Sequence, residues 1–214
     1  MPMRAKFLSL CTWLLVACGT FLAACGALDY WDSRSAQTQI AEEWQQDQPE
    51  LPPAIRDTPQ SSATPRPREI HTANANRRPD QGTAVAKLLI PRLDTVLYVL
   101  EGTDYRDLKR GPGHVTGSVL PGEDGNCIIA GHRDTHFRVL KNIQEGDEII
   151  LERGGRQFHY RVNGMTIVRP DNTASLRPTS QAVLNLITCY PFRYVGSAPK
   201  RFIVHADLEG SGSG

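Results

Sequence analysis

The cysteine at position 189 is the main candidate in this sequence for covalent chemistry. It ends the apolar run 186–188, and Pro191 stops the β-strand that this run predicts. The thiol is therefore expected at a strand end, where side chains meet loops and solvent. A thiol becomes a good nucleophile as a thiolate, which requires a nearby base or cation. Cys189 is a candidate nucleophile, and the alternative is an inert cysteine of a protein core.

Two further residues are candidate partners for this thiol. His132 follows the apolar run 126–131 and also leaves a predicted strand, while Arg201 lies at the entrance to the last predicted strand. Acyl transfer from a peptide passes through an oxyanion, to which a fixed guanidinium can donate. If the strand ends meet on one rim of a barrel, imidazole and thiol come within reach. The alternatives are a surface histidine and a solvated cation.

A disulfide and a metal site are the two rival uses of these side chains. If Cys189 lies beside His132, Cys127 is five strand residues away, about 16 Å, whereas a disulfide needs Cα atoms within about 7 Å. We therefore predict that Cys127 fills the core. A zinc site would use His132, Asp134, His136 and Cys189. Two histidines at His-x-x-x-His spacing lie on one face only within a helix, and Gly131 and Asp134 do not favour a helix there. We therefore expect neither a metal nor a cofactor.

These residues must be held by a scaffold rich in short strands. The predicted strands are residues 84–91, 95–100, 126–131, 147–152, 157–162, 165–168, 183–188 and 201–206, and Gly154-Gly155 indicates a hairpin. Helix signals are confined to residues 105–109 and 137–143. Many short strands broken by Gly and Pro indicate a closed or nearly closed β-barrel over residues 84–209. Residues 210–214 are predicted to form a flexible tail.

The N-terminal part of the chain predicts an anchor and a spacer. Residues 7–28 carry no charge and follow Arg4 and Lys6, so residues 1–31 are predicted to be a single-pass anchor with its N-terminus in the cytoplasm. The alternative is a lipoprotein lipidated at Cys25. Residues 32–83 are predicted to be a polar helix, solvated and packed on nothing, followed by a Pro-rich linker. Either anchor places the folded domain outside the cytoplasm.

The charge balance excludes one class of partner. The 214 residues include 24 Lys and Arg against 23 Asp and Glu, a net charge of +1. A nucleic-acid-binding protein normally carries a concentrated basic face. We therefore expect no nucleic-acid partner.

Three segments resemble the sortases, and among them class D. Residues 126–135 (NCIIAGHRDT) are similar to the family's histidine-bearing strand, and residues 185–189 (NLITC) resemble its T-L-x-T-C signature with Asn185 in place of Thr. Residues 196–204 (GSAPKRFIV) resemble its arginine-bearing last strand. The resemblance covers residues 84–209 and implies a closed eight-stranded barrel.

The resemblance also implies an activity and the roles of four residues. Cys189 would attack the carbonyl after Thr in a Leu-Pro-x-Thr sorting motif, and His132 would serve the leaving and incoming amines. Arg201 would bind substrate and stabilise the oxyanion, and Thr188 would add a hydrogen bond there. The implied partners are exported proteins that bear the motif and an amine acceptor. A peptidase that only hydrolyses, or a tethered module without enzyme activity, are the alternatives.

Overall fold

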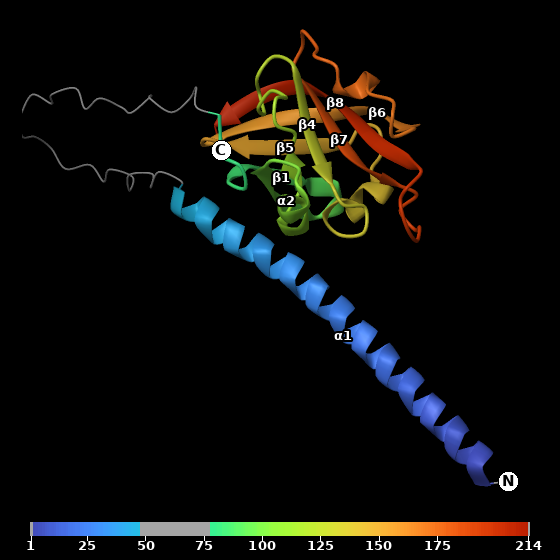
Figure 1. Cartoon of the computed structure of the whole chain (residues 1–214). Helices are drawn as coiled ribbons and strands as arrows, with labels where there is room; N and C mark the ends of the chain where they lie inside the picture. The colour runs from blue at the N-terminus through green and yellow to red at the C-terminus, as the bar shows by residue number, and fades with distance from the viewer. Residues whose placement is uncertain (1, 48–77, 214) are drawn as a thin grey trace, which may run out of the picture.

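Eight strands of the described chain close into a barrel. The computed structural model describes residues 2–47 and 78–213. The strands are β1 (Ala84–Ile90), β2 (Thr95–Glu101), β3 (Gly113–His114), β4 (Asn126–Gly131), β5 (Glu148–Arg153), β6 (Arg156–Val168), β7 (Val183–Tyr190) and β8 (Lys200–Ser213). They follow the order β1-β2-β3-β4-β7-β8-β6-β5 around the closed sheet (Figure 1). The predicted closed, mainly β barrel of eight strands is confirmed.

Helical elements are few in the described residues. A long helix, α1 (Pro2–Asp47), precedes the barrel, and α2 (Tyr105–Arg110) follows β2. Three 3-10 turns complete the set, η1 (Pro91–Leu93), η2 (His136–Asn142) and η3 (Ala174–Leu176). The helices predicted at residues 105–109 and 137–143 correspond to α2 and η2. Residues 48–77, which include most of the predicted Pro-rich linker, lie outside the described residues.

The strands differ from the prediction in three places. The two runs expected at residues 157–162 and 165–168 form one strand, β6, whose register against β8 shifts twice, at His159/Tyr160 and Val162/Gly164. β8 continues to Ser213 where a tail was expected from residue 210, because the long β6 offers it pairing partners as far as Arg156. The two-residue β3 was not predicted, since two residues carry no periodic pattern.

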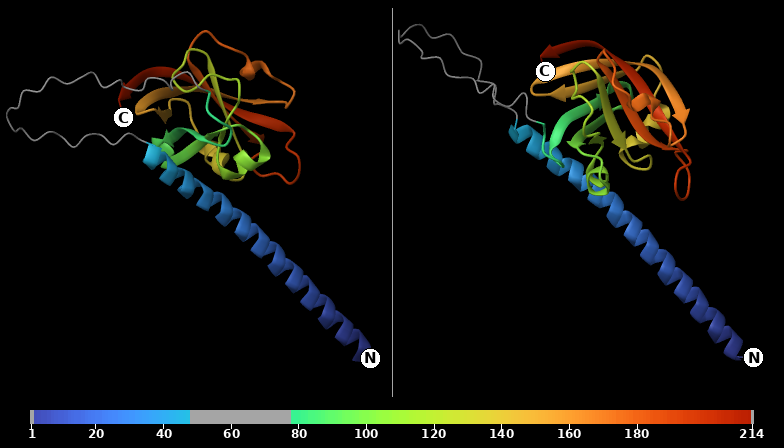
Figure 2. Two further views of the ribbon diagram at one scale, coloured as in Figure 1. Left: turned by 60° about the vertical axis from the view of Figure 1, so that its left-hand side comes forward. Right: turned by 45° about the horizontal axis from the view of Figure 1, so that its top comes forward.

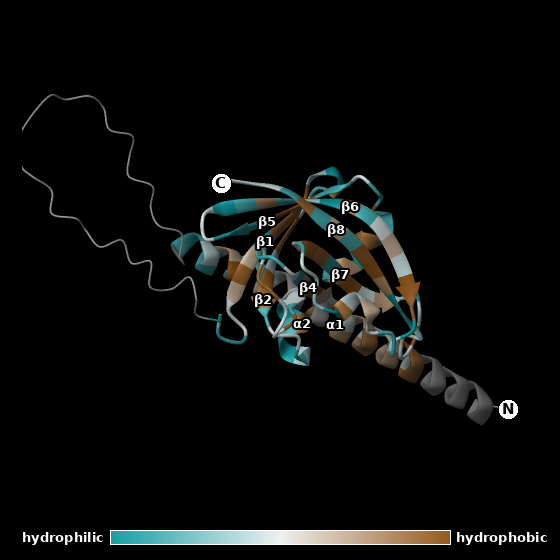
Figure 3. Ribbon diagram, turned by 90° about the horizontal axis from the view of Figure 1, so that it is seen from above, coloured by the Kyte–Doolittle hydropathy of each residue, from teal (hydrophilic) through white to brown (hydrophobic). Residues whose placement is uncertain are grey.

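The barrel interior is an apolar core contributed by every strand except β3. Leu88, Leu151 and Leu186 are fully buried there, as is Phe137 from η2. Figure 3 shows hydrophobic residues on the barrel strands and hydrophilic residues on α2 and the neighbouring loops. Cys127 belongs to this core and is 1% exposed with a free thiol, so its predicted role as core filler is confirmed.

The last turns of α1 pack against the barrel, which corrects the prediction of a helix that contacts nothing. Ile40 is fully buried, and Trp44 lies 6.3 Å from the Tyr98 ring between centroids. The Gln37 amide accepts from the Tyr98 N–H at 2.8 Å and donates to the Tyr98 carbonyl at 3.2 Å and the Arg110 carbonyl at 2.8 Å. This contact escaped prediction because Gln37 recognises backbone groups, and side-chain patterns do not reveal those.

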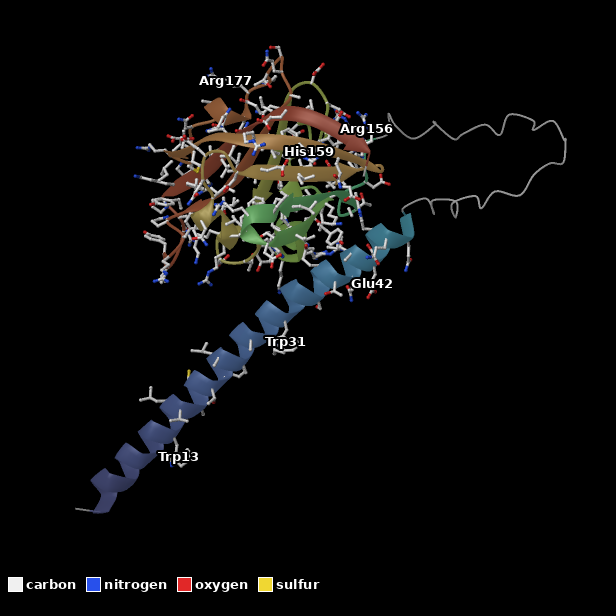
Figure 4. All side chains as sticks on the ribbon, turned by 180° about the vertical axis from the view of Figure 1, so that it is seen from behind. Trp13, Trp31, Glu42, Arg156, His159 and Arg177 are labelled. Atoms are coloured by element: carbon white, nitrogen blue, oxygen red, sulfur yellow. The ribbon has the colours of Figure 1, made fainter. Side chains whose placement is uncertain are left out.

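The rest of α1 projects away from the barrel. Figure 2 shows this in two views, and Figure 4 places Trp13 and Trp31 on the projecting part. These two side chains are 71% and 74% exposed. Over the part of the chain whose side chains the structure describes, residues 13–28, 31, 35–46 and 78–212, no helix is long and apolar enough to cross a bilayer.

Candidate active site

Strand register brings the three predicted catalytic residues into one row. β4 pairs with β7 in parallel up to Gly131 and Thr188. His132 directly follows Gly131, and Cys189 directly follows Thr188. β7 pairs with β8 in antiparallel fashion, with Cys189 directly opposite Arg201. Paired residues share a face, and neighbouring strands lie about 4.8 Å apart. We call His132, Cys189 and Arg201 the first row.

The first row lies on the face of the sheet turned away from the core. Along β7, Leu184, Leu186 and Thr188 are buried toward the barrel interior, while Asn185, Ile187 and Cys189 alternate to the other face. Cys189 is half-buried and its thiol is free. The structure thus separates its two barrel cysteines, with Cys127 in the core and Cys189 at an open strand end.

The residue before the nucleophile candidate has a different contact. Thr188 is 2% exposed, and its hydroxyl donates to the Gly131 carbonyl at 2.7 Å. This bond ties the ends of β7 and β4 together directly beneath the first row. The predicted contact of Thr188 with substrate stays a prediction, and in this structure the hydroxyl is committed to the sheet.

His132 is held from both sides. Its backbone carbonyl accepts the Phe137 N–H at 3.0 Å, which joins His132 to the first turn of η2. Its ring meets the Tyr105 ring of α2 edge-on, with centroids 6.5 Å apart. The Phe137 ring of η2 packs closely on β4 only because residue 131 is a glycine, since a Cβ there would lie 2.7 Å from two carbons of that ring. β4, η2 and α2 therefore fix where the imidazole can be.

Arg201 lies against the loop that joins β7 to β8. Its Nη1 donates to the Lys200 carbonyl at 3.1 Å and to the Ala198 carbonyl at 3.4 Å. These contacts hold the guanidinium at the β8 entrance, and Arg201 itself pairs directly with Cys189 of β7. A guanidinium at this position can donate to an oxyanion that forms on the thiol side of the row.

The comparisons with known proteins agree with this geometry. Residues 88–209 match the family model described as Sortase domain. The chain belongs to the sortase family. It is 32% identical to Sortase D of Bacillus subtilis (strain 168) over 192 residues, which are 89% of this chain and 93% of that relative. Sortase homologues are cysteine transpeptidases, so the chain is a sortase-type cysteine transpeptidase.

Solved structures extend the similarity to class D. The catalytic domain of B. anthracis SrtD superposes with a TM-score of 0.57 at 33% identity, covering 65% of this chain and 97% of that one. The Clostridium perfringens Sortase D5 transpeptidase gives a TM-score of 0.57 at 29% identity, covering 61% and 82%. Both are sortases of the class that the three sequence segments resemble.

Sequence reasoning missed one residue at the sortase site. Arg133 follows His132, and its Nη2 donates to the carbonyls of Tyr194 and Gly196, at 3.0 and 3.1 Å. Its guanidinium carbon also lies 5.7 Å from the centre of the Tyr194 ring, in a cation–π contact. Arg133 therefore fastens the β7–β8 loop, which carries Arg201, to the end of β4. Its place beside His132 was the available signal, but its acceptors are backbone carbonyls.

The residues of the zinc alternative are not gathered in this sortase. Among the side chains that the structure describes, His132, Asp134, His136 and Cys189 included, no three His, Cys, Asp or Glu lie together as metal ligands would. His136 is the first residue of the 3-10 turn η2, and residues 133–135 form a turn before it, so the two histidines are not i, i+4 residues of an α-helix.

Proposed function

We propose that this chain is a membrane-tethered sortase that cleaves a Leu-Pro-x-Thr type motif in exported proteins and transfers the acyl part to an amine. The observation that carries the proposal is the first row, in which Cys189 and Arg201 are paired across β7 and β8 and His132 directly follows the last β4 residue paired with β7. Each group matches a need of acyl transfer: a nucleophile, a proton carrier and an oxyanion donor.

The first half of the reaction forms a thioester. The Cys189 sulfur, as thiolate, attacks the carbonyl carbon of the motif Thr, and the carbonyl electrons move to an oxyanion that Arg201 stabilises. The C–N bond then breaks, and His132 gives its proton to the leaving amine. Loss of one such oxyanion donor costs about 100- to 1,000-fold in rate in acyl-transfer enzymes.

The second half returns the enzyme to its starting state. An amine attacks the thioester carbon, His132 accepts the amine proton, and the C–S bond breaks to release the Cys189 thiolate. The new amide joins the substrate to the acceptor. Water attacking at the same carbon would give a carboxylic acid, which is the outcome of the peptidase alternative.

The proposed tether is the N-terminal part of α1. Residues 7–28 carry no charge, and exposed apolar side chains such as Leu15, Phe21 and Leu22 line the projecting helix. Exposed apolar surface of this extent is typical of contact with membrane or protein. We propose a single pass through the cytoplasmic membrane with the barrel outside; the alternative attachment is a lipid on Cys25.

The test follows the acyl group on the intact chain. The protein is incubated with a Leu-Pro-x-Thr peptide, with and without an added amine, and both enzyme and products are analysed by mass spectrometry. We expect an acyl-enzyme on Cys189 and an amide product when amine is present. Cys189→Ala should form neither, whereas Cys127→Ala, the matched control in the core, should form both. Acid product alone at saturating amine would establish the peptidase instead.

A further inference from the structure

The face that carries the first row continues as a floor of further rows. The next row on this face is two residues away on each strand and consists of the apolar residues Ala130, Ile187 and Ile203, which we call the second row. Two residues further lie Ile128, Asn185 and His205, the third row. The floor therefore changes from apolar to polar along its length, and Asn185 is the residue that departs from the sortase signature.

The polar end is joined by one chain of hydrogen bonds from four strands. Thr166 Oγ1 lies 2.8 Å from His205 Nε2, and His205 Nδ1 lies 2.5 Å from Asn185 Oδ1. The Asn185 amide then donates to Asn126 Oδ1 at 2.7 Å. Every bond in this chain has a donor and an acceptor when the Thr166 hydroxyl donates to Nε2 and a neutral His205 donates through Nδ1 to Asn185 Oδ1. The Asn185 amide N–H then donates to Asn126 Oδ1. Burial lowers the pKa of His205, although Asp207 raises it in part, which agrees with the neutral ring.

The same chain holds the loop between β6 and β7. The Asn126 amide donates to the carbonyls of Ser175 and Arg177, at 2.8 and 2.9 Å. Figure 4 shows Arg177 in this loop at the edge of the barrel. Buried amides are stable only when hydrogen-bonded, so this bonding fixes the loop above the polar end of the floor.

A cavity of about 600 Å³ lies between this loop and the strands. Its lining includes Asn126, Asn185, His205, Thr166 and the carboxylate-bearing Asp207. The Asn185 amide carries a second N–H, and Thr166 and Asp207 carry further acceptor capacity. The cavity thus offers donors and acceptors together, in contrast to the second row beside it.

The spacing of the rows indicates which residue of a bound peptide reaches this cavity. Two rows along β7 are four residues, about 14 Å in an extended chain. An extended substrate that lies along the floor, with its Thr carbonyl at Cys189, brings its Pro over the apolar second row. The residue four positions before Thr, directly ahead of Leu in Leu-Pro-x-Thr, then reaches the third row.

We infer that the cavity is a subsite for a polar side chain of the substrate, borne by the residue immediately before the Leu-Pro-x-Thr motif. The inference rests on the proposed function. It adds a selection upstream of the motif, made through the Asn185–His205 pair. A carboxamide such as that of Gln can donate and accept at once, as the cavity requires, whereas Leu of similar size would leave buried polar groups unpaired.

The test compares peptides that differ only in the residue ahead of the motif. Gln and Leu are placed there in an otherwise constant Leu-Pro-x-Thr peptide, and kcat and KM are measured with the intact chain. One hydrogen bond is typically worth about a tenfold change in affinity. We expect the Gln peptide to have a kcat/KM about tenfold higher, chiefly through a lower KM. Equal values for the two peptides, or a preference that follows the residue after Thr instead, would overturn the inference.

Variants then locate the preference in the third row. In Asn185→Leu and in His205→Leu the Gln-to-Leu ratio should fall to near one. His159→Leu is the matched control, because His159 is also half-buried and bonded on a strand, to Glu148 at 2.9 Å, but lies outside the cavity lining. A ratio of about ten that survives in both third-row variants would contradict the inference. Absence of acyl-enzyme with every peptide would instead contradict the proposed function.

Discussion

Cys127 and Cys189 lie on neighbouring strands, yet their surroundings differ in every respect that matters for reactivity. Cys127 points into the core, where burial raises the pKa of its thiol. Cys189 points to the opposite face, with Arg201 directly across the strand pair. A buried thiol stays protonated and inert, while a thiol at an open strand end is accessible to a substrate. At the scale of residues, the face of the strand decides between packing and chemistry.

The sequence alone was sufficient to predict the residues of the first row but not their supports. His132, Cys189 and Arg201 end or begin apolar runs, and such ends are visible in the printed order. Arg133 acts on the carbonyls of Tyr194 and Gly196, about 60 residues away. Nothing in the local sequence of either partner encodes that pairing, so a three-dimensional structure was needed to find it.

We predict that Arg201→Lys lowers kcat/KM about 100-fold, mainly through kcat. An ammonium group is a single point charge and cannot reproduce the planar fork of a guanidinium at an oxyanion. Steady-state kinetics with a Leu-Pro-x-Thr peptide would measure the loss. Arg156→Lys, an exposed arginine of β6 away from the first row, should stay within about twofold of the parent. Near-normal turnover by Arg201→Lys would remove Arg201 from the oxyanion site.

Short elements around β4 set the geometry of the site at the next scale. Strand β4 ends at Gly131, and η2 begins five residues later with Phe137 inserted beneath that glycine. The sequence predicted both elements, because each has its own periodic or apolar pattern. It did not predict their contact, since the glycine shows only that some close approach is allowed.

We predict that Gly131→Ala lowers both stability and activity. The added Cβ would lie 2.7 Å from the Phe137 ring, and a fully buried ring has no room to withdraw. Overpacking of this kind costs about 1–3 kcal/mol, and the shift reaches the adjacent His132. Chemical denaturation and peptide kinetics would measure the two effects. Gly210→Ala, where an added Cβ meets nothing within 4 Å, should change neither. Equal behaviour of the two variants would refute the packing argument.

A second element-scale contact fastens η1 to the start of β5. Arg92 Nη2 donates to Asp147 Oδ2 at 2.6 Å, Arg92 Nε donates to Asp147 Oδ1, and the Gln144 N–H donates to Oδ2 at 2.8 Å. The hydrogen bond from Arg92 is the main cause of the lowered pKa of the Asp147 carboxyl. A lowered pKa in the folded state means that the unfolded state binds the proton more tightly.

We predict that Asp147→Asn is less stable than the parent at neutral pH and that the difference shrinks in acid. The stabilisation by the carboxylate is fully present above the unfolded pKa, near pH 4, and is lost as pH falls through the lower folded pKa. Thermal unfolding between pH 7 and pH 2 would measure the gap. Asp171→Asn, which breaks an exposed pair with Arg169, should show almost no gap at any pH. A gap for Asp147→Asn that stays constant down to pH 2 would contradict the prediction.

At the scale of the whole molecule, the contact between α1 and the barrel joins the proposed tether to the catalytic domain. Strand β2 pairs with the short β3 only at Leu100 and Glu101, which leaves the backbone of Tyr98 open on that side. The Gln37 amide supplies one acceptor and one donor to Tyr98, as a neighbouring strand would. An open strand edge is prone to pair with other chains, and covering it is a common protection.

The same helix end also touches α2, whose Tyr105 packs on His132. The barrel is therefore held at a defined orientation to the last turns of α1, rather than only through the linker. Burial of a side chain the size of Ile40 typically contributes about 1.5–3 kcal/mol, which favours the docked helix.

We predict that undocking α1 exposes the β2 edge while the barrel stays folded. In the double variant Gln37→Ala, Ile40→Asp, the Tyr98 amide loses its acceptor and the helix loses its buried anchor. Hydrogen exchange at Tyr98 should accelerate at least tenfold, while core amides such as that of Leu151 keep their protection. Gln45→Ala, an exposed position on the same helix, should leave the Tyr98 rate unchanged. Unchanged hydrogen exchange at Tyr98 in the double variant would mean that α1 does not cover the β2 edge in solution.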